Sequence, residues 1–186
     1  MKRLFPSLTD DPKLGDVFRR FPEGLAPLME YHDRVLRDEG PLTVGERELI
    51  AAYVSSLNAC SFCLDGHVTF ARAHGIDAEV IAALLEDVES EVVDPKLRPI
   101  LKYVAKLTLT PSRLVEADAE EVYAAGWSEE ALFIAIQTAA LFNLMNRIVD
   151  GTGVTPFLEK DDDRRPEDLP RMESYADFFA ALREAG

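Results

Sequence analysis

Apolar residues recur with the period of an α-helix along almost the whole chain. Between Leu49 and Leu57 they fall three and four positions apart, a spacing that places side chains on one face of a helix. No stretch alternates apolar and polar residues between two hairpin turns, which is the pattern of a half-buried strand. The sequence therefore predicts an all-α protein.

Capping residues, glycines and prolines mark the ends of these expected helices. Thr43 and Glu46 have the spacing of a capping box, and Gly75 follows a helix end. The expected helices cover residues 25–38, 43–57, 60–74, 77–85, 97–107, 111–126 and 128–148. The last of them is apolar on most faces, so we expect it at the buried centre of the domain.

The chain is expected to form one helical domain over residues 1–158, followed over residues 159–186 by a charged connector and an amphipathic helix. Three consecutive aspartates, residues 161–163, and two prolines are typical of an extended, solvated connector. After it, one apolar stripe is formed by Tyr175, Phe178, Phe179 and Leu182. A helix this short is not stable alone, so it should pack on its own domain or across a subunit interface.

The composition is that of a soluble globular protein, with 47% hydrophobic and 29% charged residues. The 34 acidic and 20 basic residues give a net charge of -14. This charge repels phosphate backbones and anionic lipids, so neither nucleic acid nor a membrane is an expected partner. No signal-peptide apolar run follows the basic start, and the longest apolar stretch is shorter than the ~20 residues of a membrane span. We therefore expect a cytoplasmic protein.

Cys60, Cys63 and His67 lie in one short predicted helix. Residues three and four positions apart share a helical face, so the two thiols and the imidazole form one stripe. Free backbone N–H groups at a helix N-terminus stabilise a thiolate, and two thiols at this spacing can close a disulfide. An imidazole one turn from Cys63 can take its proton directly or through one water. The pattern favours dithiol redox chemistry.

The residues alone leave two questions open. The first-turn position favours Cys60 as the more acidic thiol, whereas the spacing to His67 favours Cys63. The same three side chains could also bind zinc, with His74 or Glu48 as a fourth ligand. A non-enzymatic helical oligomer with a zinc site and a redox-sensing protein without enzymatic turnover are therefore alternative functions.

Other side chains give weaker signals. Helical periodicity places Glu48 off the apolar stripe of its helix, where it would be solvated. His74 ends its helix and is expected to be a cation there, while nothing assigns His32. Phe70 and Trp127 are core candidates that could also line a substrate pocket.

The arrangement of Glu48, eleven residues, Cys60-x-x-Cys63, three residues and His67 resembles the signature of the alkylhydroperoxidase D (AhpD)-like, peroxidase-related branch of the carboxymuconolactone decarboxylase family. The stretch Asn143-x-x-Asn146-Arg147-x-x-Asp150 is also similar to peroxidase-related members, and for Asn146, Arg147 and Asp150 we expect a structural polar network at a helix end rather than a catalytic role. The resemblance covers residues 40–154. It implies an all-helical trimer or hexamer that reduces hydroperoxides without a cofactor or metal.

The resemblance also implies a role for each matching residue. Cys63 corresponds to the peroxidatic thiol, Cys60 to the resolving thiol, His67 to a proton relay and Glu48 to the general base. A hydroperoxide is implied as substrate and a lipoyl or thioredoxin-like dithiol as reductant. Phe62 departs from the pattern, because the best-known members have a second histidine between the cysteines.

Overall fold

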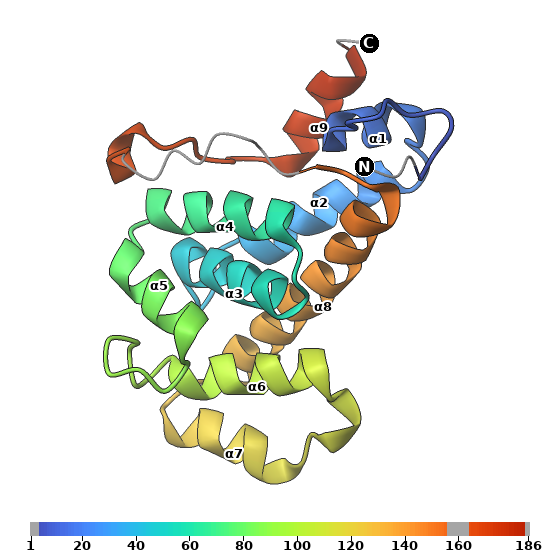
Figure 1. Ribbon diagram of the computed structural model, residues 1–186. Helices are drawn as coiled ribbons and strands as arrows, with labels where there is room; N and C mark the ends of the chain where they lie inside the picture. The colour runs from blue at the N-terminus through green and yellow to red at the C-terminus, as the bar shows by residue number, and fades with distance from the viewer. Residues whose placement is uncertain (1–3, 156–163, 185–186) are drawn as a thin grey trace.

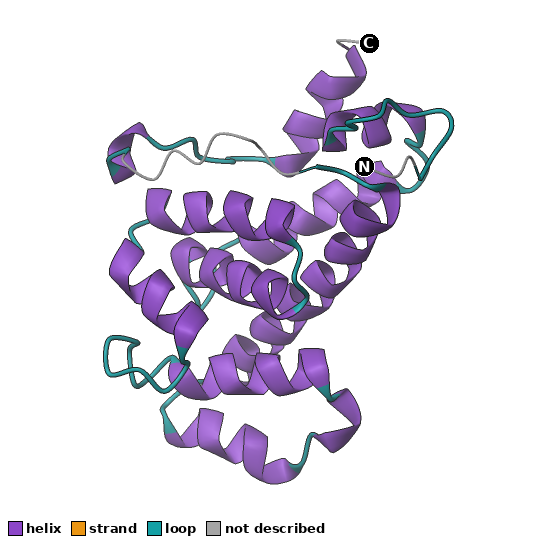
Figure 2. Cartoon of the chain, in the orientation of Figure 1, coloured by secondary structure: helices purple, strands orange, loops and turns teal. Residues whose placement is uncertain are grey.

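The computed structural model describes residues 4–155 and 164–184, and within these ranges the chain is helical, with no strand (Figure 2). Its α-helices are α1 (Leu14–Arg20), α2 (Leu25–Leu36), α3 (Val44–Leu57), α4 (Ser61–Ala73), α5 (Ala78–Glu86), α6 (Arg98–Leu109), α7 (Glu116–Ala124), α8 (Glu129–Thr152) and α9 (Tyr175–Glu184). Two 3-10 turns, η1 (Pro111–Arg113) and η2 (Pro166–Asp168), join them. The predicted all-α class is confirmed.

Local capping explains where the best-predicted helices begin. The Thr43 hydroxyl accepts a hydrogen bond from the Glu46 backbone N–H at 3.2 Å, and the Thr43 N–H donates to the Glu46 carboxylate at 2.7 Å. This is the reciprocal capping box that the sequence predicted. Ser128 likewise accepts from the Ala131 N–H at 3.1 Å, so α8 begins where expected.

Two segments differ from the predicted helices. The prediction of one helix from residue 111 to 126 is wrong, because η1 ends at Arg113 and α7 begins at Glu116. The Asp118 carboxylate accepts the Val115 N–H at 2.8 Å and so starts a new helix after the break. The sequence analysis also missed α1, which begins where the Lys13 N–H donates to Asp16 at 2.9 Å.

The helix α3 lies at the centre of the molecule, packed against α4, α8 and α6 (Figure 1). Residues 45 and 47–55 are all buried. A side chain at Gly45 would place its Cβ 2.8 Å from the His74 carbonyl oxygen, so glycine permits the close approach of α3 to the end of α4. We predicted α8 as the buried centre, and α3 is enclosed more completely.

The helix α8 runs across the back of this core. Its length and composition would suit a membrane span, but half of that apolar window is buried inside the protein. It packs on α3, α6, α2 and α4, while Phe133 and Leu144 on its outer face are exposed. These contacts place α8 in the core of the helical domain.

The C-terminal helix α9 packs on α2 and α1 of its own chain (Figure 1). The Asp33 carboxylate of α2 fastens its first turn, accepting hydrogen bonds from the backbone N–H groups of Tyr175 at 2.6 Å and Ala176 at 3.1 Å. Tyr175 and Phe179 are buried. The predicted boundary at residue 158 and the aspartate-rich part of the connector fall in residues 156–163, outside the described residues.

Candidate active site

Cys60 and Cys63 stand at the beginning of α4, where the chain reverses after α3. Cys60 precedes the first helical residue, and Cys63 lies in the first turn. Ala59 between the helices has a left-handed φ of 57°, and the Cys60 N–H then donates to the Ser55 carbonyl oxygen at 2.9 Å. Both residues are free thiols, with exposed fractions of 1% and 5%. The turn thus delivers two buried sulfurs to the N-terminal end of one helix.

The two thiols share a hydrogen bond, which shifts their pKa values in opposite directions. This bond from Cys63 lowers the pKa of Cys60, against the opposing effect of burial. The same bond, burial and the nearby Cys60 charge raise the pKa of Cys63. The pair therefore releases one proton readily and holds the second, as expected when one S–H stabilises the other sulfur as a thiolate.

A polar cluster on α3 and α8 lies behind the sulfurs. The Asn58 amide donates to the Asn146 side-chain oxygen at 2.9 Å, and the Asn146 amide donates to the Ser55 hydroxyl at 3.0 Å. Asn146 also hydrogen-bonds with Cys63, an interaction that lowers the pKa of this thiol without overcoming the effects that raise it. The network at the end of α8 thus contacts the thiol pair.

His67 and Glu48 form a buried pair between α4 and α3. The His67 Nδ1–H donates to the Glu48 carboxylate at 2.5 Å. Arg37 lies 2.6 Å from the other carboxylate oxygen, and the Tyr175 hydroxyl donates to that oxygen over 3.5 Å. The expectation of a solvated Glu48 is wrong, because it is fully buried among these partners.

The charge state of Glu48 follows from these neighbours. Burial alone raises the pKa of a carboxyl group, but the charges and hydrogen bonds of His67 and Arg37 outweigh it here. They hold the pKa of Glu48 below its ordinary range, so the group is a carboxylate at neutral pH. A carboxylate in this place fixes the Nδ1–H tautomer of His67 and turns the other ring nitrogen away from Glu48.

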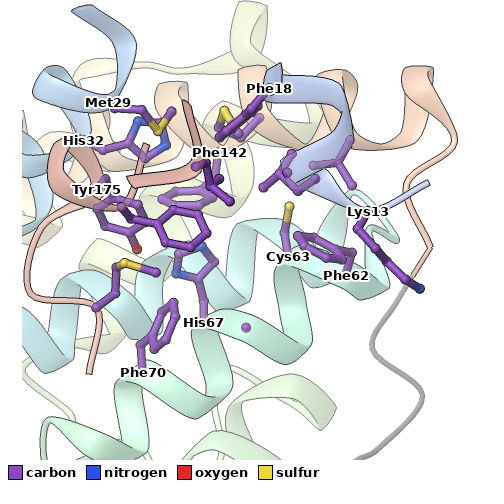
Figure 3. Close-up of a pocket in the computed structure, with 18 of the residues that line it drawn as sticks. Lys13, Phe18, Met29, His32, Phe62, Cys63, His67, Phe70, Phe142 and Tyr175 are labelled. Carbon is purple, nitrogen blue, oxygen red and sulfur yellow. The ribbon is translucent and has the colours of Figure 1, made fainter. Parts of the chain in front are cut away.

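A cavity of about 380 Å³ opens beside the pair (Figure 3). Cys63 and His67 line it, whereas Cys60 and Glu48 are not among the lining residues. Most of the remaining wall is aromatic or contains methionine, with contributions from α1, α2, α4, α8 and α9. The site therefore offers the Cys63 thiol and the His67 imidazole to an apolar ligand, with the second thiol and the carboxylate behind these two groups.

Several predicted site neighbours are placed differently. Phe70 lines the cavity, but Trp127 does not, and its indole N–H donates to the Lys96 carbonyl at 2.7 Å. The prediction of a cationic His74 is not supported, because burial and then the Arg37 charge lower its pKa. The sequence analysis missed Arg37 as a partner of Glu48 and left His32 unassigned, because no local pattern on α2 marks either residue.

No group of three or more histidine, cysteine, aspartate or glutamate side chains within residues 4–155 and 164–184 is arranged to bind a metal ion. A zinc site needs a fourth ligand, for which the sequence analysis offered Glu48 or His74. Glu48 is instead bound to His67 and Arg37. The geometry favours a proton relay over the zinc alternative.

Comparison with known proteins connects this geometry to a family. Residues 22–106 match the carboxymuconolactone decarboxylase family. The chain is 28% identical over 127 residues to the uncharacterized protein YdfG of Bacillus subtilis (strain 168), covering 68% of this chain and 85% of YdfG. The segment that matches the family, residues 22–106, runs from α2 into α6 and includes both cysteines, His67 and Glu48.

Solved structures share the fold over a longer part of the chain. An uncharacterized peroxidase-related protein with an alkylhydroperoxidase AhpD core, from Ralstonia eutropha JMP134, superposes with a TM-score of 0.74 at 24% identity, covering 83% of this chain and 80% of that one. A peroxidase-related protein from Silicibacter sp. TM1040 has a TM-score of 0.72 at 26% identity, covering 79% and 77%. The debrominase Bmp8, in its C82A form with 2,3,4-tribromopyrrole, reaches 0.66 at 16% identity, covering 75% and 73%. The fold is thus associated with more than one reaction.

Proposed function

Because residues 22–106 match the carboxymuconolactone decarboxylase family and the chain has the AhpD-like fold, we propose that it is a thiol-dependent hydroperoxidase. One observation carries this proposal. Cys63 and His67 line the same cavity, and the Cys60 sulfur is hydrogen-bonded to Cys63 from behind. A substrate in the cavity contacts the Cys63 thiol, and the oxidised Cys63 sulfur then lies next to the Cys60 thiol.

In the first step, Cys63 acts as the nucleophile. The thiolate is most stable on Cys60, so a proton passes along the S–H···S hydrogen bond from Cys63 to Cys60 before attack. The Cys63 sulfur attacks the terminal peroxide oxygen, the O–O bond breaks, and Cys63 becomes a sulfenic acid. The proton that the thiol pair first released to His67 then passes from His67 to the leaving alkoxide, which departs as an alcohol.

Glu48 acts in this scheme as a positioning residue rather than as a base that touches substrate. It does not line the cavity, so it reaches the chemistry only through His67. Its carboxylate fixes the ring and stabilises the imidazolium form that His67 takes when it carries a proton. The family resemblance implies that Glu48 is the general base. In the scheme proposed here, Glu48 instead orients His67 and does not itself take a proton from the substrate.

In the second step, Cys60 resolves the oxidised thiol. Its sulfur attacks the Cys63 sulfenic acid, the hydroxyl leaves with a proton as water, and a disulfide forms. A dithiol reductant of the lipoyl or thioredoxin-like class then restores both thiols and becomes a disulfide itself. Each cycle converts one hydroperoxide and two thiols into an alcohol, water and one disulfide. We place the reaction in the cytoplasm, in a homo-oligomer that is a trimer or hexamer.

One observation favours a second candidate function. Both sulfurs are buried, with exposed fractions of 1% and 5%, so a protein reductant must gain access before it can exchange with the disulfide. A redox-sensing protein, which forms the disulfide and keeps it, would not need such access. The two functions differ in turnover with excess reductant and not in formation of the first disulfide.

The test is free-thiol titration with intact-mass measurement, before and after one equivalent of cumene hydroperoxide. We expect the wild-type protein to lose both thiols. Cys63→Ser should keep its thiol, and Cys60→Ser should gain one oxygen and then oxidise further. Ser61→Ala changes an exposed neighbour and should react like wild type.

Other outcomes have distinct meanings. Rapid oxidation of Cys63→Ser with an inert Cys60→Ser would reverse the order of the thiols. Thiols that stay reduced in the wild-type protein would contradict the peroxidase. Disulfide formation without repeated turnover, in the presence of excess dihydrolipoamide, would favour the redox sensor.

A further inference from the structure

The second histidine of the cavity, His32, is held in one tautomer. Its Nδ1 lies 2.7 Å from the Leu28 carbonyl oxygen, one turn earlier on α2. A carbonyl oxygen only accepts hydrogen bonds, so Nδ1 carries the proton. Burial lowers the pKa of His32 to about 4, and the ring is neutral at physiological pH. Its Nε2 is therefore a lone-pair acceptor.

Among the described residues, the hydrogen bond found for the His32 ring is the one at Nδ1, and Nε2 is not one of the fully buried atoms without a partner, so Nε2 is open to the cavity. His32 is 2% exposed and lines the cavity. Its ring neighbours are Tyr175, at 5.0 Å between centroids, and Phe142, at 6.1 Å. Polar atoms in protein interiors are nearly always hydrogen-bonded, so an acceptor that opens onto a cavity points to a ligand in the cavity that donates to it.

The position of His32 in the cavity indicates which part of a ligand it meets. Figure 3 shows His32 beside Met29 and Tyr175 on one side of Phe142, with Cys63 and Phe62 on the other side. The wall between them is apolar, and the cavity of about 380 Å³ is within the size range of small-molecule sites. A ligand that reacts at Cys63 would meet Nε2 with its far end.

We propose that His32 Nε2 accepts a hydrogen bond from the substrate, and that the cavity selects an apolar, ring-sized molecule with a hydroxyl or N–H donor at the end remote from its peroxide group. This inference rests on the proposed function for the placement of the peroxide at Cys63. The donor requirement itself follows from the tautomer, the burial and the apolar surroundings of His32.

The test measures binding without turnover, so its result does not depend on peroxidase activity. The probes are 4-ethylphenol and its methyl ether, 4-ethylanisole, which differ in the hydrogen of one oxygen. We expect isothermal titration of the reduced wild-type protein to show the phenol bound about threefold to tenfold more tightly than the ether, the range for one neutral hydrogen bond. His32→Phe should bind the two probes equally.

A matched variant separates the acceptor from the shape of the cavity. Met29→Leu alters the same wall and removes no nitrogen, so it should keep the preference for the phenol. Equal affinities in the wild-type protein, a preference that survives in His32→Phe, or no binding of either probe would overturn the inference. Thiol oxidation by hydroperoxide would still stand in each of these cases.

A spectroscopic measurement serves where His32→Phe does not fold. In wild-type protein labelled with nitrogen-15 at histidine, we expect the His32 Nε2 resonance to be that of an unprotonated ring nitrogen. It should move toward the position of a hydrogen-bonded nitrogen when the phenol is added and stay in place with the ether. A protonated Nε2 in the free protein, or no response to the phenol, would contradict the assignment.

Discussion

The two histidines that line the cavity are held in opposite ways. His67 on α4 donates its Nδ1–H to the Glu48 carboxylate, and Arg37 adds a positive charge at the same carboxylate. His32 on α2 donates its Nδ1–H to the neutral Leu28 carbonyl and otherwise contacts rings. The cavity therefore has a charged wall at His67, with the buried Glu48–Arg37 ion pair behind it, and a neutral wall at His32.

This difference does not come from burial, because both rings are nearly inaccessible, with exposed fractions of 7% and 2%. The partner of Nδ1 decides it. A carboxylate stabilises a ring that gains a proton, whereas a carbonyl oxygen fixes the tautomer of a ring that stays neutral. In the proposed scheme, the same residue type thus supports proton transfer on one wall and ligand recognition on the other.

The largest expected effect comes from removing the charge that defines the first wall. Glu48→Gln leaves the Arg37 guanidinium without its carboxylate in a buried place, and breaking a buried ion pair costs several kcal/mol. We expect the free energy of unfolding to fall by about 3 kcal/mol, which corresponds to a decrease of roughly 6–12 °C in Tm for a chain of this size. Urea unfolding and calorimetry measure both quantities.

The control for this variant is Glu30→Gln, which makes the same chemical change at an exposed position of α2. It should change stability by less than about 0.5 kcal/mol. A Glu48→Gln protein as stable as Glu30→Gln would mean that the carboxylate contributes no net charge stabilisation. The contrast between the two walls would then not hold.

The second prediction tests the neutral wall by its response to pH. His32 has a pKa of about 4 in the folded protein and 6.5 as the reference for the unfolded chain, so the unfolded state binds more protons between these values. Stability is then fully present above about pH 6.5 and is lost as the pH falls toward 4. When the pH falls from about 7 to about 5, the titration of His32 should lower the free energy of unfolding by about 2 kcal/mol.

Urea unfolding at both pH values provides the measurement. The decrease in wild-type stability should exceed that of His32→Phe by about 2 kcal/mol, because phenylalanine has no proton to gain. An identical pH dependence in the two proteins would show that His32 is not forced to stay neutral. The two walls of the cavity would then not differ in the way that the structure indicates.

The contrast also shows which parts of the site could be predicted from the sequence. Cys60, Cys63 and His67 lie within two turns of one helix, so local spacing alone placed them together. The capping box at Thr43 was predictable for the same reason. The break between η1 and α7 was not, because it depends on a backbone bond to the Asp118 side chain.

The other half of the site comes from segments that are distant in sequence. Periodicity placed Glu48 in solvent, and only the family resemblance singled it out, because its burial depends on Arg37 and His67. Nothing in α2 distinguishes His32 from a surface histidine. Tyr175 was predicted as an apolar residue of a packed stripe, and its contact with Glu48 depends on where α9 docks.

The third prediction concerns the attachment of α9 to the neutral wall. Asp33→Ala removes the acceptor of the Tyr175 and Ala176 backbone N–H groups at the start of this helix. Loss of such a cap costs about 1 kcal/mol. We expect that decrease in unfolding free energy, together with faster hydrogen exchange at these two amides.

Asp38→Ala is the matched control, because its carboxylate makes an exposed ion pair with Arg34 at 3.3 Å. Exposed pairs of this kind contribute about 0–0.5 kcal/mol. Unchanged exchange at the two α9 amides in Asp33→Ala would indicate that apolar packing alone holds this helix. The cavity wall that α9 provides would then be independent of α2.

The smallest effect is expected at the residue that touches both walls. The Tyr175 ring contacts His32, while its hydroxyl is 3.5 Å from the Glu48 carboxylate. Burial and then the Glu48 charge raise the pKa of Tyr175, so the hydroxyl stays protonated and donates. A bond this long is weak, and Glu48 keeps its two closer partners, so Tyr175→Phe should lower the free energy of unfolding, measured with urea, by about 0.5 kcal/mol.

Tyr31→Phe, which removes an exposed hydroxyl bonded to Gln137 at 3.1 Å, is the matched control. A loss several times larger than in the control would make the phenol a full partner of Glu48. Tyr175 would then belong to the charged wall, and His32 would be in contact with that wall rather than opposite it.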